Sequence, residues 1–192
     1  MDKLINAVKE NFGILSGEEM EFLTSFFQKE VINKNDYFTR ENGYCKKLSF
    51  QESGILRIYK NTDKGAVTQW LSTPGNFMTE INSFFFDQPS RWSIQALSDV
   101  TLFTLHLSDY KILCKELPKW NAIEKNFIAS CFRDLEDRVF SHLYMTAKER
   151  YDSYFKRYPE LFNQVPLQYI ASVIGMSPET LSRIRKQNLL NS

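Results

Sequence analysis

Hydrophobic positions change their spacing twice along the chain, and each change predicts a change of secondary structure. Residues 2–12 have helical spacing, and Ser16 with Glu19 has the pattern of a capping box that opens a second helix. From about residue 30 to Leu107, short runs rich in aromatic and β-branched residues alternate with turn signals. Many short strands with regular turns predict an antiparallel jelly roll or barrel.

A hairpin and a long helix follow from the same reading. Residues 55–59 and 66–71 flank a turn that contains glycine, so they predict a β-hairpin. Helical spacing returns at Ser108, and a segment without glycine or proline then runs from Pro118 to about Met145. One apolar stripe of this segment, in steps of four, consists of Ile123, Phe127, Cys131, Leu135, Val139 and Leu143, and a second consists of Ile128, Phe132 and Phe140. Two stripes need two neighbours, so this helix is expected to cover the body and to join a second subunit, unless it is a single thick core helix.

The last stretch, residues 164–186, predicts two short helices joined by a turn. Leu167, Ile170, Ala171 and Ile174 share one face of the first helix, which Gly175 ends. Ser177 is expected to be the N-cap of the second helix, with Pro178 at its first position. Leu181 and Ile184 face inward in this arrangement. The residues left outside are Glu179, Thr180, Ser182, Arg183, Arg185 and Lys186.

This two-helix pattern indicates a DNA-binding helix-turn-helix, in which side chains of the second helix enter the major groove. A carboxylate, two hydroxyls and Arg183 suit base edges, and the later cations Arg185 and Lys186 suit phosphates. The alternative is a helical hairpin that serves only for packing.

Composition and charge agree with a globular protein whose C-terminal end is basic. The chain of 192 residues is 43% hydrophobic and 24% charged, with a net charge of only +1. From Thr146 onward seven Lys or Arg residues stand against four Asp or Glu, a local net of +3, and the rest carries −2. This asymmetry favours contact with nucleic acid through the end alone.

Cys45, Cys114 and Cys131 form neither a CxxC pair nor a disulfide framework, which favours a reducing compartment. The sequence shows no signal-peptide pattern and no apolar run of membrane-spanning length. We therefore expect a cytoplasmic protein that does not contact a membrane.

The order of small helices, jelly roll, long helix and terminal helix-turn-helix resembles the Crp/Fnr family of bacterial transcription regulators. The resemblance covers nearly the whole chain and is most specific in the stretch IGMSPETLSRIRK. There Glu179, Ser182 and Arg183 reproduce the Glu-x-x-Ser-Arg arrangement of the Fnr branch, although no cysteine before Cys45 exists to hold that branch's iron–sulfur centre. The resemblance implies an α+β chain with a jelly-roll sensor domain at 1–117, a dimerisation helix at 118–145 and a helix-turn-helix domain at 146–192.

The resemblance also locates a candidate effector site. The family's cyclic-nucleotide cassette has a Gly-Glu pair, followed about ten residues later by an arginine and a hydroxyl residue. Glu80 matches, but Thr79 replaces the glycine, and Arg91 arrives one residue late and precedes Trp92. A one-residue slip on a strand would turn Arg91 to the other face, and the run from Phe84 to Phe86 suits a filled pocket. We therefore expect no cofactor and weak or absent binding of cyclic AMP.

An enzyme is the least favoured class. His106 and His142 are the only histidines and lie far apart in the sequence, so no metal-ligand cluster is expected, and no phosphate-binding loop or nucleophile elbow occurs. The expected partners are double-stranded DNA and a second copy of the chain, with RNA polymerase as a further candidate. The alternative is a cyclic-nucleotide-binding signalling module whose terminal helices bind a protein.

Overall fold

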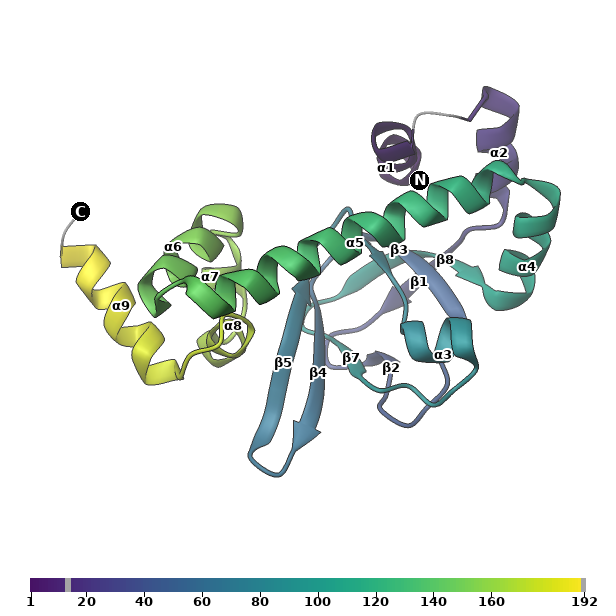
Figure 1. The fold of residues 1–192 in the computed structure, drawn as a ribbon. Coiled ribbons are helices and arrows are strands. Elements are labelled where there is room, and N and C mark those ends of the chain that lie inside the picture. The colour runs from purple at the N-terminus through teal and green to yellow at the C-terminus, as the bar shows by residue number, and fades with distance from the viewer. Residues whose placement is uncertain (13–14, 191–192) are drawn as a thin grey trace. The chain divides into compact units, whose positions relative to one another are not determined.

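The computed structural model describes residues 1–12 and 15–190 and has the mixed helix and antiparallel-sheet fold expected from the sequence (Figure 1). Its contacts divide the chain into two compact units. The first contains Met1–Ile58 and Ser72–Cys131, and the second contains Tyr59–Leu71 and Phe132–Ser192. The division into 1–117, 118–145 and 146–192 stays a prediction. The contacts divide the long helix between Cys131 and Phe132, and they group Tyr59–Leu71 with the C-terminal helices.

Two four-stranded sheets form the jelly roll. The first has the order β1-β8-β3-β6 and the second has the order β2-β7-β4-β5. In the first sheet every neighbouring pair is antiparallel. The strands are β1 (Gln28–Ile32), β2 (Tyr37–Thr39), β3 (Lys47–Ser53), β4 (Leu56–Thr62), β5 (Gly65–Ser72), β6 (Phe77–Met78), β7 (Ser93–Ala96) and β8 (Val100–His106). The predicted hairpin is the pair β4 and β5.

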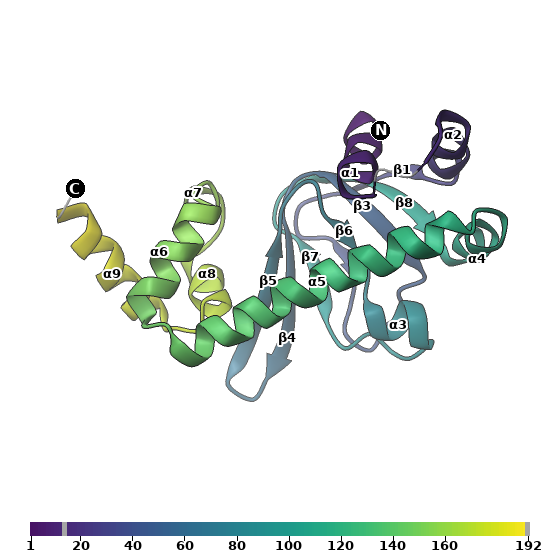
Figure 2. The ribbon, with the colours of Figure 1, turned by 45° about the horizontal axis from the view of Figure 1, so that its top comes forward.

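Side chains of the first sheet alternate between an apolar face and a polar face, because successive residues of a strand point to opposite sides. On β3, Leu48 and Phe50 join the main hydrophobic core, whereas Ser49 and Gln51 are buried on the other side. Phe103 and Leu105 of β8 belong to the same core, and four helices supply much of the rest; Figure 2 shows these helices gathered beside β3 and β8. They are α1 (Asp2–Phe12), α2 (Gly17–Ser25), α4 (Leu107–Glu116) and the start of α5 (Lys119–Tyr144), and α2 begins with the predicted capping box.

The apolar stripes of α5 differ from those predicted. Ile123 is 2% exposed in the core, whereas Leu143, five steps of four further on, is 78% exposed. The reason is that four residues turn an α-helix by about 40° more than one full turn, so a row in steps of four winds around it. One continuous exposed face instead contains Ile128, Phe132, Leu135, Val139 and Leu143.

The second unit packs its helices around a small aromatic and aliphatic core. Phe162 contacts the rings of Tyr151 and Phe155, and Leu181 is fully buried. Tyr59–Leu71, most of the β4–β5 hairpin, belongs to the same unit. There the Ser172 hydroxyl accepts from the Thr68 amide at 2.8 Å and donates to the Thr68 carbonyl at 3.1 Å. The helices are α6 (Ala147–Arg157), α7 (Leu161–Gln164), α8 (Leu167–Val173) and α9 (Pro178–Leu190).

Two short helices, α7 and α3 (Ile81–Phe86), were not predicted from the sequence. Neither is long enough for apolar residues to repeat at helical spacing over several turns. No helix within residues 1–12 and 15–190 is long and apolar enough to cross a membrane.

Candidate nucleic-acid interface and effector site

The turn between α8 and α9 has the local chemistry expected from the sequence. Gly175 has a φ of 64°, in the left-handed region that favours glycine, and it follows the end of α8. The Ser177 hydroxyl then accepts the Thr180 amide at 3.2 Å, so Ser177 caps α9. Pro178 begins α9, where a missing N–H leaves no hydrogen bond unmade.

Arg150 of α6 holds this turn in place through hydrogen bonds from its guanidinium. Its guanidinium donates to the carbonyls of Ile174 at 2.8 Å and Gly175 at 3.2 Å, and to the carbonyl of Met145 at 2.7 Å. These carbonyls lie where helices end and have no partner within their own helix. A β-carbon added at Gly175 would lie 2.8 Å from Cδ2 of His142, so the turn is also tightly packed.

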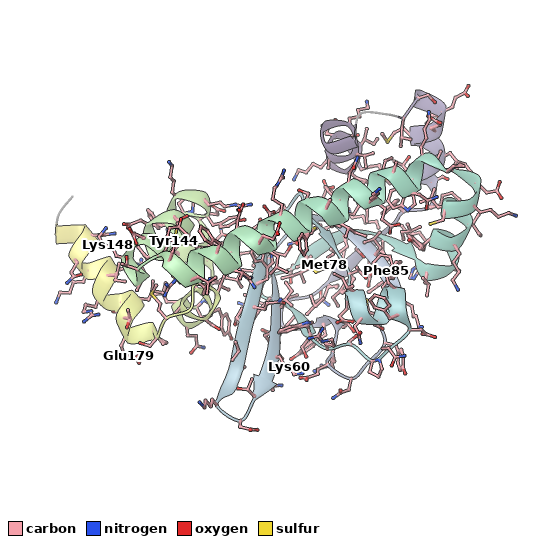
Figure 3. All side chains as sticks on the ribbon, in the orientation of Figure 1. Lys60, Met78, Phe85, Tyr144, Lys148 and Glu179 are labelled. Carbon is pink, nitrogen blue, oxygen red and sulfur yellow. The ribbon has the colours of Figure 1, made fainter. Side chains whose placement is uncertain are left out.

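The exposed face of α9 carries four of the six predicted DNA-contacting residues. Glu179, Ser182, Arg183 and Lys186 are exposed, while Leu181 and Ile184 are buried on the opposite face. Figure 3 shows Glu179 at the first turn of α9, directed away from the helices behind it. Within the described part of the chain, Ser182, Arg183 and Lys186 make no hydrogen bond or ion pair through their side chains, so their polar groups are available to a ligand.

Glu179 is prepared to act as a hydrogen-bond acceptor. Its own backbone N–H and the Ser177 hydroxyl both hold the pKa of its carboxyl below the usual range. A negative charge in the first turn also agrees with the positive end of the helix dipole. The side chain therefore stays ionised well below neutral pH.

Thr180 and Arg185 differ from the outward placement expected of them. Both are half-buried at the margins of the exposed face. The Thr180 hydroxyl lies 3.2 Å from the Ser177 hydroxyl, and the Arg185 guanidinium lies 5.8 Å from the centre of the Phe162 ring. Gln187 is exposed on α9 and was missed, because an uncharged side chain near the end of the segment gives little sequence signal.

The three predicted effector residues lie around the loop that contains α3. Glu80 is 3% exposed, and its two carboxylate oxygens accept the amides of Ser83 at 2.8 Å and Arg91 at 3.1 Å. The carboxylate thus caps α3 and holds the main chain at Arg91. The Thr79 hydroxyl donates to the Lys47 carbonyl at 2.9 Å. Glu80 thus connects the segment that begins at Thr79 with the main chain at Arg91, and these three hydrogen bonds all join a side chain to a backbone group.

Two parts of the sequence argument about this loop were wrong. Arg91 lies in a bend before β7 rather than on a strand, so strand alternation does not decide where its exposed side chain points. The run Phe84–Phe86 does not fill a pocket as a unit. Phe84 is 3% exposed in the main core, but Phe85 and Phe86 are 38% and 66% exposed, because consecutive residues of a helix point in different directions.

Sequence reasoning missed a polar cluster on the inner face of the first sheet. The Lys47 ammonium lies 2.5 Å from the Glu30 carboxylate and 4.6 Å from the centre of the Phe38 ring, which belongs to the second sheet. The Thr104 hydroxyl donates to Glu30 at 2.8 Å and also lies 2.8 Å from the hydroxyl of Ser49. Single charged residues on separate strands give no sequence signal until the register is known.

Burial alone would raise the pKa of the Glu30 carboxyl, but hydrogen bonds from Lys47 and Thr104 outweigh it and lower the pKa. Replacing Glu30 by glutamine should therefore reduce the free energy of unfolding at neutral pH by about 1–2 kcal/mol. The expected loss is small because the Glu30–Lys47 pair is partly solvated. A lowered folded-state pKa contributes fully above the ordinary carboxyl pKa and is lost as pH falls through the lowered value.

The difference between the two proteins should thus be constant down to about pH 5 and shrink below about pH 4. Urea unfolding at a series of pH values measures it. The exposed Glu21→Gln is the control and should change stability little at any pH. A difference for Glu30→Gln that stays undiminished at pH 3 would contradict this account.

Comparisons with known proteins agree with this arrangement. Residues 29–116 match the family model described as the cyclic nucleotide-binding domain. The chain is similar in structure to the catabolite activator protein of Thermus thermophilus, with 22% identity, a TM-score of 0.57, and coverage of 94% of this chain and 86% of that one. FixK2 from Bradyrhizobium japonicum gives 16% identity and a TM-score of 0.71 over 86% and 85% of the two chains.

A putative transcriptional regulator of the Crp/Fnr family from Eubacterium rectale is 18% identical, with a TM-score of 0.69 over 94% of this chain and 86% of that one. No curated protein sequence matches the chain. Residues 29–116 are thus similar to a cyclic nucleotide-binding domain. The fold of the whole chain is similar to the folds of these three proteins, one of which is described as a putative Crp/Fnr regulator, so the resemblance seen in the sequence is confirmed at the level of the fold.

The names of two of these similar proteins describe an activator protein and a putative transcriptional regulator. Within the described residues, no group of three or more His, Cys, Asp or Glu side chains is placed to hold a metal ion.

Proposed function

We propose that the protein is a DNA-binding transcription regulator of the Crp/Fnr type. The observation that carries the proposal is the exposed face of α9, where Arg183, Ser182 and Lys186 have no side-chain partner among the described residues. A helix that follows a tightly packed turn and presents unpaired polar groups suits insertion into the major groove. The similarity of the fold to that of a putative Crp/Fnr regulator supports the same conclusion.

The arrangement of the face suggests how bases would be distinguished. Arg183 would donate to O6 and N7 of a guanine, and Glu179 would accept from a cytosine amino group. Ser182 would contact a neighbouring base, and a half-site with a TGA-like core is expected from the Fnr-branch pattern. Lys186 lies further along the same exposed face and would meet a phosphate, and Arg185 would do so after leaving the Phe162 ring.

A homodimer is the second part of the proposal. The exposed residues of α5 at positions 128, 132, 135, 139 and 143 follow steps of four and three, which is the spacing of a coiled-coil seam. A contiguous apolar face of this kind indicates a partner in solution. Two-fold symmetry would match a palindromic site with half-sites about 34 Å apart.

Selection of bound DNA from a random pool tests the function directly. The expected outcome is a palindromic sequence whose affinity falls steeply as salt rises, through release of counterions from the phosphates. If no sequence is enriched and the chain shows no salt-dependent DNA binding, the proposal fails. A binding module whose terminal helices contact a protein would then be the better account.

Cyclic AMP is expected to bind weakly or not at all. Both oxygens of Glu80 already accept backbone amides, and Thr79 stands where the family has glycine. Calorimetry with the full chain measures the affinity. Micromolar or tighter binding that is lost in Arg91→Ala would contradict this expectation and show that the exposed Arg91 guanidinium pairs with the phosphate.

A further inference from the structure

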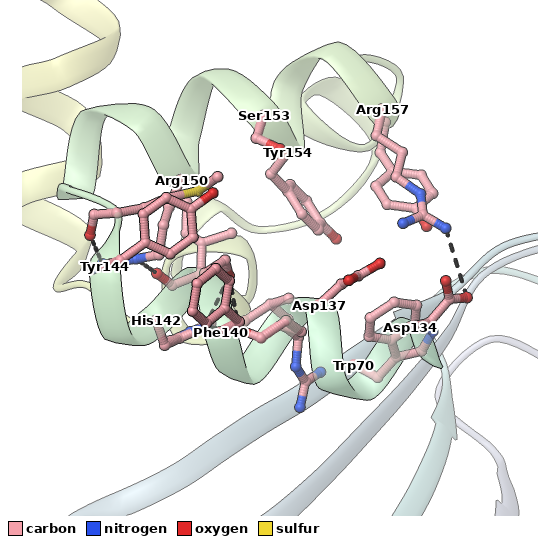
Figure 4. A pocket seen from close by; sticks show the side chains of 16 residues that line it. Trp70, Asp134, Asp137, Phe140, His142, Tyr144, Arg150, Ser153, Tyr154 and Arg157 are labelled. Carbon is pink, nitrogen blue, oxygen red and sulfur yellow. Dashed lines mark hydrogen bonds and ion pairs between the residues drawn. The ribbon is translucent and has the colours of Figure 1, made fainter. Parts of the chain in front are cut away.

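A pocket of about 370 Å³ lies within the second unit (Figure 4). Its walls come from the last half of α5, from α6, from the end of α8 and from Trp70 of β5. A volume of this size is in the range of small-molecule sites, which are mostly apolar and contain a few convergent polar groups. Nothing in the proposed DNA-binding function requires this pocket.

Three arginines line the pocket, and two of them already have partners. Arg150 donates from Nε, Nη1 and Nη2 to three backbone carbonyls, so its guanidinium is occupied in holding the turn before α9. Nη2 of Arg157 lies 3.8 Å from the carboxylate of Asp134. Neither cation is free to bind an anion without breaking a contact within the protein.

Arg138 is different, because its half-buried charge has no counter-charge. Nη1 donates to the Gln69 carbonyl at 2.7 Å, and the guanidinium carbon lies 5.4 Å from the centre of the Trp70 ring. No carboxylate of the described residues lies within ion-pair distance, and Nε and Nη2 have no acceptor among them. Burial lowers the pKa of this guanidinium.

Tyr154 supplies a second unpaired donor. Its side chain extends into the pocket (Figure 4), and its hydroxyl makes no hydrogen bond to any group that the structure describes. Burial, reinforced by Tyr158, raises the pKa of this phenol far above the usual range, so it keeps its proton and can donate. An unpaired donor that is partly buried costs free energy that a ligand's acceptor would recover.

The remaining walls favour a flat ring. Trp70, Phe140 and Tyr144 line the pocket, and the rings of Phe140 and Tyr144 pack with their centres 4.6 Å apart. Aromatic side chains bind planar apolar ligands through offset or edge-on contacts. Asp137 also lines the pocket, but it is exposed, so its charge is solvated and screened by salt.

We propose that this pocket binds a small aromatic carboxylate. The carboxylate would accept from the free N–H groups of Arg138 and from the Tyr154 hydroxyl, and its ring would pack among the aromatic walls. A planar guanidinium matches the geometry of a carboxylate and binds it with two parallel hydrogen bonds. The inference concerns a ligand site and does not depend on whether α9 binds DNA.

Calorimetry on the full chain tests the site with 2-naphthoate and with the uncharged 2-naphthamide. The expected result is submillimolar binding of 2-naphthoate at one site per chain, and at least about tenfold weaker binding of the amide. Arg138→Gln should weaken 2-naphthoate binding about tenfold or more. Arg133→Gln, on the same helix but outside the pocket, should leave the affinity unchanged.

Tyr154→Phe decides the matter if Arg138→Gln does not fold, because it removes only one oxygen. It should weaken 2-naphthoate binding about threefold or more and leave binding of the amide less affected. Absence of 2-naphthoate binding, equal affinity for the two ligands, or unchanged affinity in Tyr154→Phe would overturn the proposal. A stoichiometry of one ligand per two chains would also overturn it, since the site would then be shared between copies.

Discussion

Replacing Phe132 by glutamate is expected to convert the proposed dimer into a monomer. Phe132 is 60% exposed and lies in the middle of the apolar face of α5, between Ile128 and Leu135. In a two-fold seam each copy would bury a carboxylate near its symmetry mate, without a counter-charge. The expected cost is about 3 kcal/mol or more, which weakens dimerisation at least about 100-fold. Light scattering at micromolar concentration measures the change.

The control for this experiment is Phe86→Glu. Phe86 is 66% exposed on α3 and outside the apolar face of α5, so this variant should stay dimeric. Both positions are exposed in the single chain, and thermal unfolding of the monomeric form should change little in either variant. A Phe132→Glu protein that remains a dimer, or a native chain that is monomeric with and without DNA, would refute the seam.

Replacing Arg183 by alanine should weaken binding to the selected DNA site by about 1–3 kcal/mol and relax selectivity at one base pair. The side chain is exposed and has no partner among the described residues, so its removal leaves the fold intact. Competition binding with DNA variants at each base pair measures both effects. Unchanged affinity and unchanged preference would show that α9 does not read bases.

Lys186→Ala is the matched control for the readout by Arg183. Lys186 lies on the same exposed face of α9, three residues or just under one turn beyond Arg183, where a phosphate contact is expected. Its removal should weaken all DNA sequences about equally and flatten the salt dependence by about one unit of slope. Loss of preference at one base pair in this variant would mean that the roles of the two cations are exchanged.

Local signals predicted most of the secondary structure. The turn between α8 and α9 needed only Gly175, Ser177 and Pro178, each of which fits one backbone position for a physical reason. The capping box of α2 and the hairpin of β4 and β5 are equally local. Features that depend on contacts between residues far apart in the sequence were harder to predict. The periodicity of α5 indicated that the helix has two apolar faces, but which residues lie on the exposed face depended on how far the row winds around it.

The candidate site shows the same limit. The outward face of α9 followed from the burial of Leu181 and Ile184, because helical spacing is fixed. The half-buried position of Arg185 did not follow, since it depends on Phe162 of another helix. Glu80 matched the cassette by sequence, yet its contacts with two backbone amides arise from the fold of the whole loop. The pair of Glu30 and Lys47 required the strand register.

The contacts of Arg150 have a mechanical consequence. One guanidinium joins the end of α5 at Met145 to the carbonyls of Ile174 and Gly175, where the turn before α9 begins. Because all three bonds share one rigid planar group, the end of α5 and that turn cannot shift independently without breaking a charge-assisted hydrogen bond. Arg150 therefore couples the end of α5 mechanically to the turn before α9. A rotation of the last turn of α5 would be transmitted to the orientation of α9 as a movement of one body.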